Sequence, residues 1–474
     1  ITTTGAITIN APITLASSPT ITTTTGNITV GNKVDGDNNL VIASTSGNVE
    51  FQNKVGTVDP FGNLEIFKTA GSGTVTFSND IGTTSAFGVE VLNIGFASAG
   101  SGTSQTDVGE VTFSGSAYNA SGQFKVQSSN IVIDGSTPQF ITNTGCTGLC
   151  FELRDGNVNL ATGSDLTIEA GKGHSSTMVV VIEGSIVGPS SGTPVDISIT
   201  NETTSSGSSS SISLNSDSNK TTGTGINDVT LSANTVNLYG NITTVANGVS
   251  DSGVVSITGA TSLQDDVAID TSSSNGTITF SSTIDGGNNL DLASGSGAVS
   301  IGGTIGGDTA LATLDINNSS GAGAITLNDI GDSNTQGLTG TSRIGNNTTT
   351  TLTLAGTTYK TDAVTYTTKA GENIDLTGGA DTTFTTTNDD ITFGTGTVEM
   401  GNGSNLIIDT GTGGGAINLP IGVMGTSSEN ITLTAGTGTV AIGTVGTGTE
   451  IADVSITTTG NTTISGDFTG GSLT

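Results

Sequence analysis

Short stretches in which apolar and polar residues alternate recur along almost the whole chain. Valine, isoleucine, leucine or phenylalanine holds every second position, and a glycine or asparagine often precedes the stretch. Alternation with a period of two, bounded by Gly, Asn and Ser, predicts short β-strands with one buried face. The clearest stretches are GNITV at 26–30, GNVEF at 47–51, GTVTF at 73–77 and GEVTF at 109–113, with NLVI at 39–42, NLEI at 63–66, GVEV at 88–91 and QFKV at 123–126 between them.

Like strands recur about every 21–26 residues, and helical periodicity is hardly visible. This spacing is too short for β-sandwich domains of about 100 residues, and it suits one coil of a parallel β-helix. Apolar residues then stack in inward columns, while Thr, Ser, Asn and Glu face water. Glycine and asparagine are expected at the corners, where left-handed backbone conformations are needed. The pattern predicts an all-β parallel β-helix (β-solenoid) of about 20 rungs.

One segment of the chain occurs twice. Residues 28–57 align with residues 278–307 at a constant offset of 250, and 13 of the 30 positions are identical. Positions that differ mostly keep their apolar or polar character, and no gap is needed until about Phe77 and Leu327. Self-similarity of this kind is typical of repeat architectures. The duplication predicts two related halves.

Two regions depart from the strand pattern. Residues 130–200 contain both cysteines, the single histidine and several prolines, and we expect a loop-rich excursion there. Residues 201–225 are rich in Ser, Thr and Gly and predict a loop or linker. The expected organisation is therefore a β-helix segment at 1–200, the loop or linker at 201–225, and a second β-helix segment at 226–474.

Composition and charge exclude several functions. The net charge is −31, and only 10 of the 474 residues are Lys or Arg. Nucleic acid is excluded as a partner, because its binding depends on neutralised phosphates, and an anionic membrane surface is disfavoured. No apolar run reaches the roughly 20 residues that span a bilayer, so we expect no membrane insertion. The strongly negative net charge favours solubility and repulsion between neighbouring molecules.

Cys146 and Cys150 are the only cysteines, and both lie in the sequence GCTGLC. They predict a short disulfide loop in an oxidising compartment. The alternative is a pair of unrelated thiols. Two cysteines and one distant histidine are too few ligands for a zinc site.

Three phrases carry a resemblance to a known group of proteins: TGNITVGNKVDGDNNLVIASTSGNVEF at 25–51, GTITFSSTIDGGNNLDLASGSGAVSIGGTIGG at 276–307 and SDSGVVSITGATSLQDDVAIDTSSSNGTITF at 250–280. They resemble the repeats of giant bacterial surface proteins, the filamentous-haemagglutinin-like and autotransporter-adhesin β-helix proteins. The resemblance implies a right-handed coil, secretion across a Gram-negative envelope, and a role as adhesin or fibre. The NPNG-like motif of the haemagglutinin secretion domain is not found in this sequence, so the resemblance does not extend to an export route.

Candidate catalytic residues are few. His174 is the only histidine, and as a base it would need an orienting partner and a nucleophile. The adjacent pairs Asp265–Asp266 and Asp389–Asp390 are poor acid/base dyads, because neighbouring residues of a strand face opposite sides. With no Trp to stack on sugars and few basic residues, we expect no enzyme. The alternative is a carbohydrate-active β-helix enzyme, a polysaccharide lyase or hydrolase.

Calcium is the only cofactor that the sequence suggests. Asp35 and Asp37 in one copy of the duplicated segment, and Asp285 in the other, place carboxylate oxygens on a turn. The calcium-binding repeat GGxGxDxUx is missing, and the second copy has no aspartate at the position of Asp37. The alternative is that Asp-Gly and Asn-Asn satisfy corner backbone geometry.

The sequence therefore predicts a non-catalytic, secreted, extracellular structural protein, either the shaft of a bacterial surface adhesin or the subunit of a cell-surface fibre. The first and last segments share the phrase ITTTG, at 1–5 and 456–460, and look like ordinary rungs. We expect self-association end to end, or continuation in a longer chain, because unpaired strand edges add further strands. A host or surface glycan or protein is a further expected partner.

Overall fold

The structure is a computed structural model. It describes residues 1–474 apart from 69–72, 84–85, 97–107, 143–145, 147, 175–176, 204–208, 218, 249–250, 402 and 447–448. Within the described residues all regular structure is β-strand, and no helix is present. Backbone contacts divide the chain into unit 1 (Ile1–Asp251) and unit 2 (Ser252–Thr474). Each unit contains one copy of the duplicated segment, and the length of unit 1 is close to the offset of 250 residues between the two copies.

The strands of unit 1 are β1 (Thr2–Thr3), β2 (Ile7–Ile9), β3 (Ile13–Thr14), β4 (Thr20–Thr23), β5 (Ile28–Val30), β6 (Val34–Asp35), β7 (Leu40–Ser44), β8 (Val49–Phe51), β9 (Phe61–Lys68), β10 (Thr74–Phe77), β11 (Val89–Ile94), β12 (Glu110–Phe113), β13 (Ala117–Ala120), β14 (Phe124–Ile133), β15 (Gln139–Thr142), β16 (Gly148–Leu160), β17 (Leu166–His174), β18 (Met178–Ile182), β19 (Ile186–Val187), β20 (Val195–Thr203), β21 (Ser210–Leu214), β22 (Thr221–Gly223), β23 (Ile226–Leu238) and β24 (Asn241–Thr243).

The strands of unit 2 are β25 (Val255–Leu263), β26 (Val267–Asp270), β27 (Ile278–Phe280), β28 (Ile284–Asp285), β29 (Leu290–Ala293), β30 (Val299–Ile301), β31 (Leu314–Ile316), β32 (Ile325–Leu327), β33 (Ser342–Ile344), β34 (Leu352–Leu354), β35 (Thr358–Lys360), β36 (Val364–Tyr366), β37 (Asn373–Leu376), β38 (Thr382–Thr385), β39 (Ile391–Phe393), β40 (Thr397–Met400), β41 (Leu406–Asp409), β42 (Ile417–Met424), β43 (Ile431–Gly436), β44 (Val440–Val445), β45 (Ile451–Thr458), β46 (Thr462–Ile464) and β47 (Gly470–Leu473).

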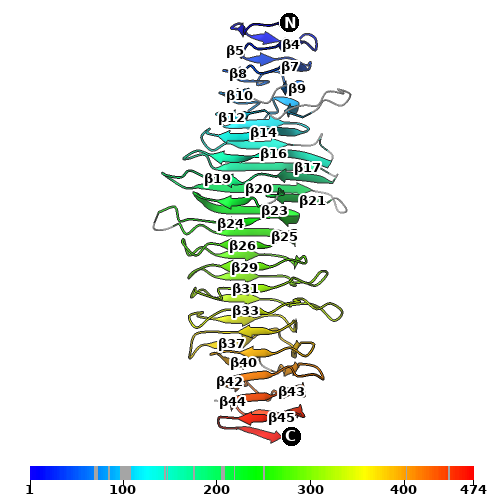
Figure 1. Ribbon diagram of the computed structural model, residues 1–474, viewed down its shortest axis with the longest axis vertical. Helices are drawn as coiled ribbons and strands as arrows, with labels where there is room; N and C mark the ends of the chain where they lie inside the picture. The colour runs from blue at the N-terminus through cyan, green and yellow to red at the C-terminus, as the bar shows by residue number, and fades with distance from the viewer. Residues whose placement is uncertain are drawn as a thin grey trace. The chain divides into compact units, whose positions relative to one another are not determined.

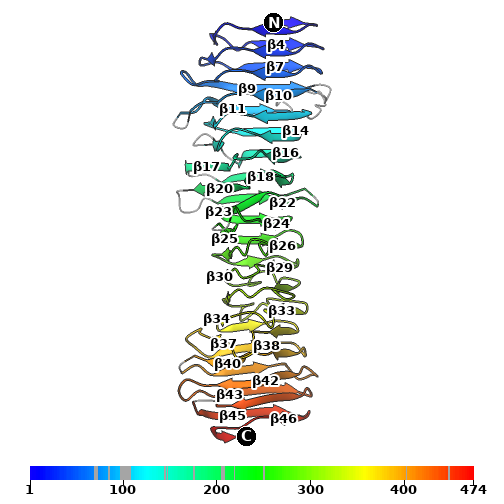
Figure 2. The same cartoon turned by 90° about the vertical axis from the view of Figure 1, so that its left-hand side faces the viewer.

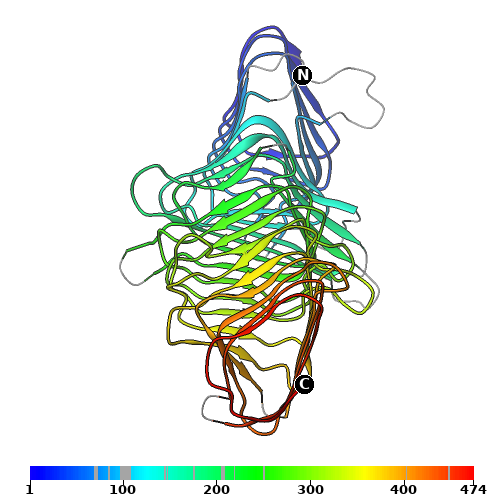
Figure 3. The same cartoon turned by 60° about the horizontal axis from the view of Figure 1, so that its bottom comes forward.

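Each unit is a parallel β-solenoid, in which a strand pairs with its counterpart one coil further along the chain. Figure 1 shows the strands of each unit stacked one above another, and Figure 2 shows the same stacks after a rotation of 90°. In Figure 3 successive coils of each unit follow one another with their strands aligned. The described residues make about 17 turns, somewhat fewer than the 20 or so expected from the spacing of like strands. The all-β parallel solenoid predicted from the sequence is confirmed, and its right-handed sense stays a prediction.

The alternating residues of the sequence form the inward columns of unit 1. Val49 pairs in register with Ile28 on the preceding coil and with Val75 on the following coil, and all three side chains are buried. Two positions further along, phenylalanine rings stack: the centroid of Phe77 lies 5.0 Å from that of Phe51. Such columns bury a continuous apolar interior, which is what makes a stack of short coils stable.

Unit 2 contains the same kind of columns, with fewer aromatic residues. One inward column joins residues of five successive coils: Ile278, Val299, Ile325, Leu352 and Ile374. Further along the unit, a cluster of four buried rings fills the interior, made by Tyr359, Tyr366, Phe384 and Phe393.

Stacked glycines allow neighbouring coils to approach at one corner. A Cβ on Gly297 would lie 2.2 Å from the carbonyl oxygen of Gly276, and a Cβ on Gly323 would lie 1.6 Å from that of Gly297. None of these three residues has a positive φ. The expectation that corner glycines supply left-handed conformations therefore holds at Gly36, with a φ of 118°, whereas at this corner glycine is needed for close backbone approach.

The duplicated segment adopts the same local structure in both units. Strands β5 to β8 of the first copy correspond to β27, β28, β29 and β30 of the second. Asn38 Nδ2 donates a hydrogen bond to the carbonyl of Leu15 at 2.8 Å, and Asn288 Nδ2 donates to the carbonyl of Leu263 at 3.0 Å. The two asparagines keep the offset of 250, while the two acceptors are 248 residues apart, so the predicted relation between the halves is present in their hydrogen bonds with a shift of two residues in the acceptor.

The structural correspondence extends beyond the sequence alignment. In unit 1 the buried hydroxyl of Tyr118 accepts a hydrogen bond from the backbone N–H of Gly115. In unit 2 the buried hydroxyl of Tyr359 accepts one from Gly356, at 3.0 Å. The offset between these tyrosines is 241, because unit 1 contains additional residues after the duplicated segment.

Two segments differ from the loops expected from composition. Residues 130–200 were expected to be loop-rich, yet they contain the long strands β16 and β17 and most of β20. Of the expected loop or linker at 201–225, the described residues include β21 and β22, which pair in parallel with coils on both sides. Serine and threonine are compatible with strands when their side chains face outward or bond to the backbone, and composition alone does not reveal this.

Candidate functional site

The sequence-predicted carboxylates Asp35 and Asp285 lie at the same corner of the two units. Asp35 Oδ1 accepts a hydrogen bond from the backbone N–H of Val58 at 3.0 Å. Asp285 Oδ1 accepts hydrogen bonds from the N–H groups of Asp308 at 2.8 Å and Thr309 at 3.1 Å. In both units the donor belongs to the following coil. These carboxylates therefore tie neighbouring coils together, and one oxygen of each is already engaged.

The remaining calcium candidate, Asp37, is exposed, and its equivalent in unit 2 is Gly287. The second oxygen of Asp35 lies 3.3 Å from Lys33 Nζ. The lysine ammonium group therefore occupies the side of this oxygen where a calcium ion would bind. Across the described part of the chain, no group of three or more His, Cys, Asp or Glu residues is arranged to hold a metal ion. The calcium hypothesis therefore rests on the sequence pattern alone.

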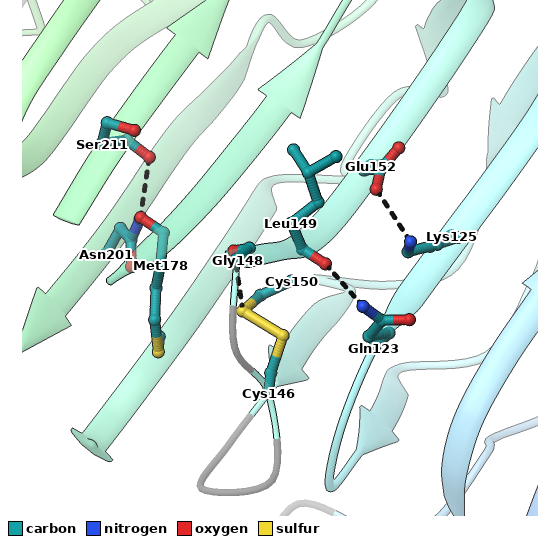
Figure 4. Close-up of a disulfide and its surroundings, with 10 residues drawn as sticks. All are labelled: Gln123, Lys125, Cys146, Gly148, Leu149, Cys150, Glu152, Met178, Asn201 and Ser211. Atoms are coloured by element: carbon teal, nitrogen blue, oxygen red, sulfur yellow. Dashed lines mark hydrogen bonds and ion pairs between the residues drawn. A yellow bond between two sulfur atoms is a disulfide. The ribbon is translucent and has the colours of Figure 1, made fainter. Parts of the chain in front are cut away.

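Cys146 and Cys150 form a disulfide at the start of β16, with a sulfur–sulfur distance of 2.11 Å. Both residues are almost completely buried and pack against Met178 of β18 (Figure 4). The three side chains form a small apolar cluster in the core of unit 1. The structure thus agrees with a disulfide loop rather than with two unrelated thiols.

The other candidates from the sequence do not come together. His174 is the last residue of β17, and its backbone pairs with Thr203. Asp266 Oδ1 accepts a hydrogen bond from the N–H of Asn289 at 2.9 Å, and Asp390 Oδ1 accepts one from Ala416 at 2.7 Å. Each carboxylate therefore binds the backbone of the following coil, as Asp35 and Asp285 do.

Carboxylates do meet in a surface groove of unit 2, which has a volume of about 430 Å³. We call it the carboxylate groove. It is lined by Glu372, Asp375 and Glu399, and by threonines, glycines, Asn373, Leu376 and Met400. Asp375 of β37 pairs in register with Glu399 of β40, so the two side chains lie on the same face of adjacent coils. Asn373 Nδ2 donates a hydrogen bond to Glu399 Oε2.

The two paired carboxyl groups of the groove differ in environment. Burial raises the pKa of Asp375 above its ordinary value, and the negative charge of Glu399 raises it further. A carboxyl group that retains its proton beside an ionised carboxylate can act as a general acid, with the second group as base or nucleophile. Among the described residues that line the groove, none is aromatic or basic. The pair has the two carboxyl groups that acid/base catalysis needs, but the described lining of the groove has no side chain on which a sugar would stack.

A second cluster of charges lies on the outer face of unit 1, and we call it the mixed-charge cluster. Glu152 is only 1% exposed, although its side chain points away from the core. Its Oε1 lies 3.1 Å from Lys125 Nζ and its Oε2 lies 2.6 Å from Arg154 Nε, while Arg154 Nη1 lies 3.4 Å from Glu183 Oε1. Both cations lie within 6 Å of the Phe96 ring. Because the charges are paired and Glu152 is covered, this cluster supports the sheet rather than a reaction.

Sequence reasoning missed both clusters because it compared neighbours along the chain. Residues 375 and 399 are 24 positions apart, and residues 125 and 152 are 27 positions apart. These separations equal one coil, and residues one coil apart on the same column are neighbours in space. A search for charged residues at the spacing of the repeat would have found both clusters.

The fold and these clusters define a β-solenoid repeat protein with an acidic exterior. In the described residues, no helix is long and apolar enough to cross a membrane. Comparison with known proteins gave no matching family model, no matching curated protein and no matching solved structure.

Proposed function

We propose that this chain is a non-catalytic extracellular structural protein, the shaft of a bacterial surface adhesin or the subunit of a cell-surface fibre. The proposal includes its membership in the filamentous-haemagglutinin-like and autotransporter-adhesin group, on the resemblance of its repeats. The observation that carries the proposal is the uniformity of the coils. Pairing and inward columns are alike from one coil to the next, so coils can be added without altering their neighbours. A chain built this way gains length with each coil.

Two further features support a position outside the cell. The disulfide between Cys146 and Cys150 is the kind of bond that persists in oxidising compartments. The net charge of −31 keeps neighbouring molecules apart and favours solubility in saline surroundings.

The location is tested by labelling intact cells of the source organism with antibodies against unit 2. We expect gold label at the cell surface in electron micrographs, without permeabilisation of the cells. Label that appears only after permeabilisation would contradict an extracellular role.

We also propose that the stack extends along its axis, by continuation in one polypeptide or by end-to-end association of chains. The backbone groups of a coil pair only with the coils before and after it, so pairing of this kind does not close on itself. Electron microscopy of native material, with and without denaturant, distinguishes the two routes. Filaments that survive denaturant are covalent, filaments that dissociate are associated chains, and rods that never exceed one chain contradict both.

The carboxylate groove favours one alternative, a carbohydrate-active hydrolase with Asp375 as general acid and Glu399 as base or nucleophile. The test is depolymerisation of polysaccharides by the wild-type chain, by Asp375→Asn and by Glu399→Gln. Asp291→Asn is the matched control, because Asp291 pairs in register with Asp315 outside the groove. Turnover lost in the groove variants and kept in the control would establish the hydrolase and overturn the structural proposal.

A further inference from the structure

Strand β16 contains a β-bulge next to the disulfide. Its pairing with β18 shifts between Leu149 and Phe151, so that Cys150 is an extra residue in the ladder. On either side of the bulge the register is regular: Gly148 pairs with Met178, Leu149 with Val179, Phe151 with Val180, Glu152 with Val181 and Leu153 with Ile182.

The bulge reverses the side-chain pattern that the sequence favours. Phe151 and Leu153 are buried, and Glu152 between them points away from the core. Regular alternation continued backwards would place Leu149 inside and Cys150 outside. In the structure Cys150 is 0% exposed, whereas Leu149 is half-buried. The smaller side chain therefore occupies the buried position and the larger one is partly exposed to water.

Two features hold this unfavourable arrangement in place. The disulfide to Cys146 draws Cys150 into the apolar cluster around Met178 (Figure 4). Gly148 adopts a φ of +78°, a conformation that side-chain-bearing residues avoid and that is common in β-bulges. A third contact, the hydrogen bond from Gln123 Nε2 to the carbonyl of Leu149 at 3.1 Å, does not fix the register. The flexible Gln123 side chain can re-form this bond after a small shift of the strand.

We propose that the Cys146–Cys150 bond is a redox-sensitive lock on the register of β16. A dithiol reductant transfers two electrons and two protons to the bond, the two cysteines become thiols, and the reductant becomes a disulfide. The segment Gly148–Cys150 then shifts by one residue along β18, so that Leu149 faces Met178. Cys150 turns outward. Burial of the larger apolar side chain drives the shift, because a one-residue slip exchanges the two faces of a strand.

The shift is local. Phe151 keeps its stacking on Phe124, where the ring centroids are 5.1 Å apart, because its own register with β14 and β18 does not change. Glu152 likewise keeps its contacts in the mixed-charge cluster. The lock therefore changes which side chains the start of β16 presents, without changing the rest of unit 1.

The first test uses Cys146→Ala, which leaves Cys150 as the only cysteine, and a charged, water-soluble maleimide as probe. We expect Cys150 of the folded variant to react about tenfold faster than in the matched control Cys146→Ala/Leu149→Ser, because the control has no apolar side chain to bury. Equal, slow labelling in the two folded variants would overturn the proposal.

The second test does not depend on the folding of the variants. The wild-type chain is reduced under native conditions with a dithiol, and hydrogen exchange is measured before and after reduction. We expect exchange to change at residues 148–150 of β16 and at their partners in β18, where the pairing shifts, with residues 151–153 and unit 2 unchanged. Unchanged exchange in β16, or a rise throughout unit 1, would overturn the proposal.

Discussion

The two units are built on the same kind of coil but differ in the number of their basic residues and in how their charged side chains pair. Unit 1 contains seven of the ten Lys and Arg residues, and 20 of the 41 Asp and Glu residues. Unit 2 contains three basic and 21 acidic residues. In the described chain the ion pairs lie in unit 1, for example Lys54 with Asp80 at 2.9 Å. In unit 2, Asp291 pairs in register with Asp315 and Asp375 with Glu399, so like charges are stacked.

This difference shows which part of the coil determines the fold. The inward columns, the corner glycines and the Asp35 or Asp285 corner are common to both units. The outward positions include ion pairs in unit 1 and two stacked carboxylate pairs in unit 2, where Asp315 also pairs in register with Arg343. The interior therefore specifies the stack, and the outer face is free to differ in charge at a small cost in stability.

The largest expected effect comes from a charge in an inward column. Val49→Asp in unit 1 and Val299→Asp in unit 2 change equivalent, fully buried positions. Each should cost about 3 to 5 kcal/mol, because an unpaired charge would be buried. Hydrogen exchange should show the loss in the unit that carries the substitution. Thr29→Ser and Thr279→Ser are the matched controls on outward positions and should cost little. Unequal losses at the two valines would break the equivalence of the units.

The next effect comes from the corner glycines. A Cβ on Gly47 would lie 1.9 Å from the carbonyl oxygen of Gly26, and one on Gly297 would lie 2.2 Å from that of Gly276. Gly47→Ala and Gly297→Ala should each destabilise their unit by about 1 to 3 kcal/mol, because the backbones must separate. Thermal or denaturant unfolding measures the loss. Gly287→Ala is the control, since a Cβ there would have nothing within 4 Å. A loss in the control as large as at the corners would contradict the stacking argument.

Acid should weaken unit 2 through one carboxylate. Burial opposes ionisation of Glu429, but hydrogen bonds from Ser427, Gly403 and Thr426 lower its pKa to about 2. Because the folded pKa lies below the ordinary value of 4.5, the stabilisation is present above pH 4.5 and is lost as the pH falls toward 2. Glu429→Gln should cost about 1 to 2 kcal/mol at pH 7 and less at pH 3. A loss that does not depend on pH would show that the charge of Glu429 is unimportant.

The smallest expected effect has the opposite sign. In the folded chain the pKa of Asp375 is raised by burial and by Glu399, so the stability linked to its proton is present below the ordinary value of 3.8 and is lost as the pH rises. Asp375→Asn should therefore stabilise unit 2 by about 0.5 kcal/mol at pH 7, and by nothing measurable near pH 3. Urea unfolding at both pH values measures the difference.

Glu152→Gln provides the contrast in unit 1, where Lys125 and Arg154 would lose their partner. This substitution should destabilise unit 1 at pH 7. If both substitutions had the same sign, the distinction between paired and stacked charges would be wrong.

The sequence predicted the inward columns because apolar alternation directly reflects burial in a strand, as at 47–51 and 297–301. It also predicted the relation between the halves, since Asp35 and Asp285 kept both their identity and their spacing. It did not predict the strands at 210–214 and 221–223, where serine and threonine dominate and the burial signal is weak. The sequence did not predict the carboxylate groove, because its residues meet across coils. Such contacts depend on the register between segments that are distant in the chain.

The central claim is that both units are stacks of in-register parallel coils with the same rise. Pulsed electron resonance between pairs of spin labels measures this rise directly. The first pair joins Ser256 and Thr353 of unit 2, and the second joins Thr29 and Val132 of unit 1; each pair is four coils apart on one outward column. We expect about 19 Å between the labelled positions in both pairs, and an increase of about 4.8 Å for each further coil. Distances that differ between the two units by more than one coil, or that do not grow evenly from coil to coil, would contradict the account.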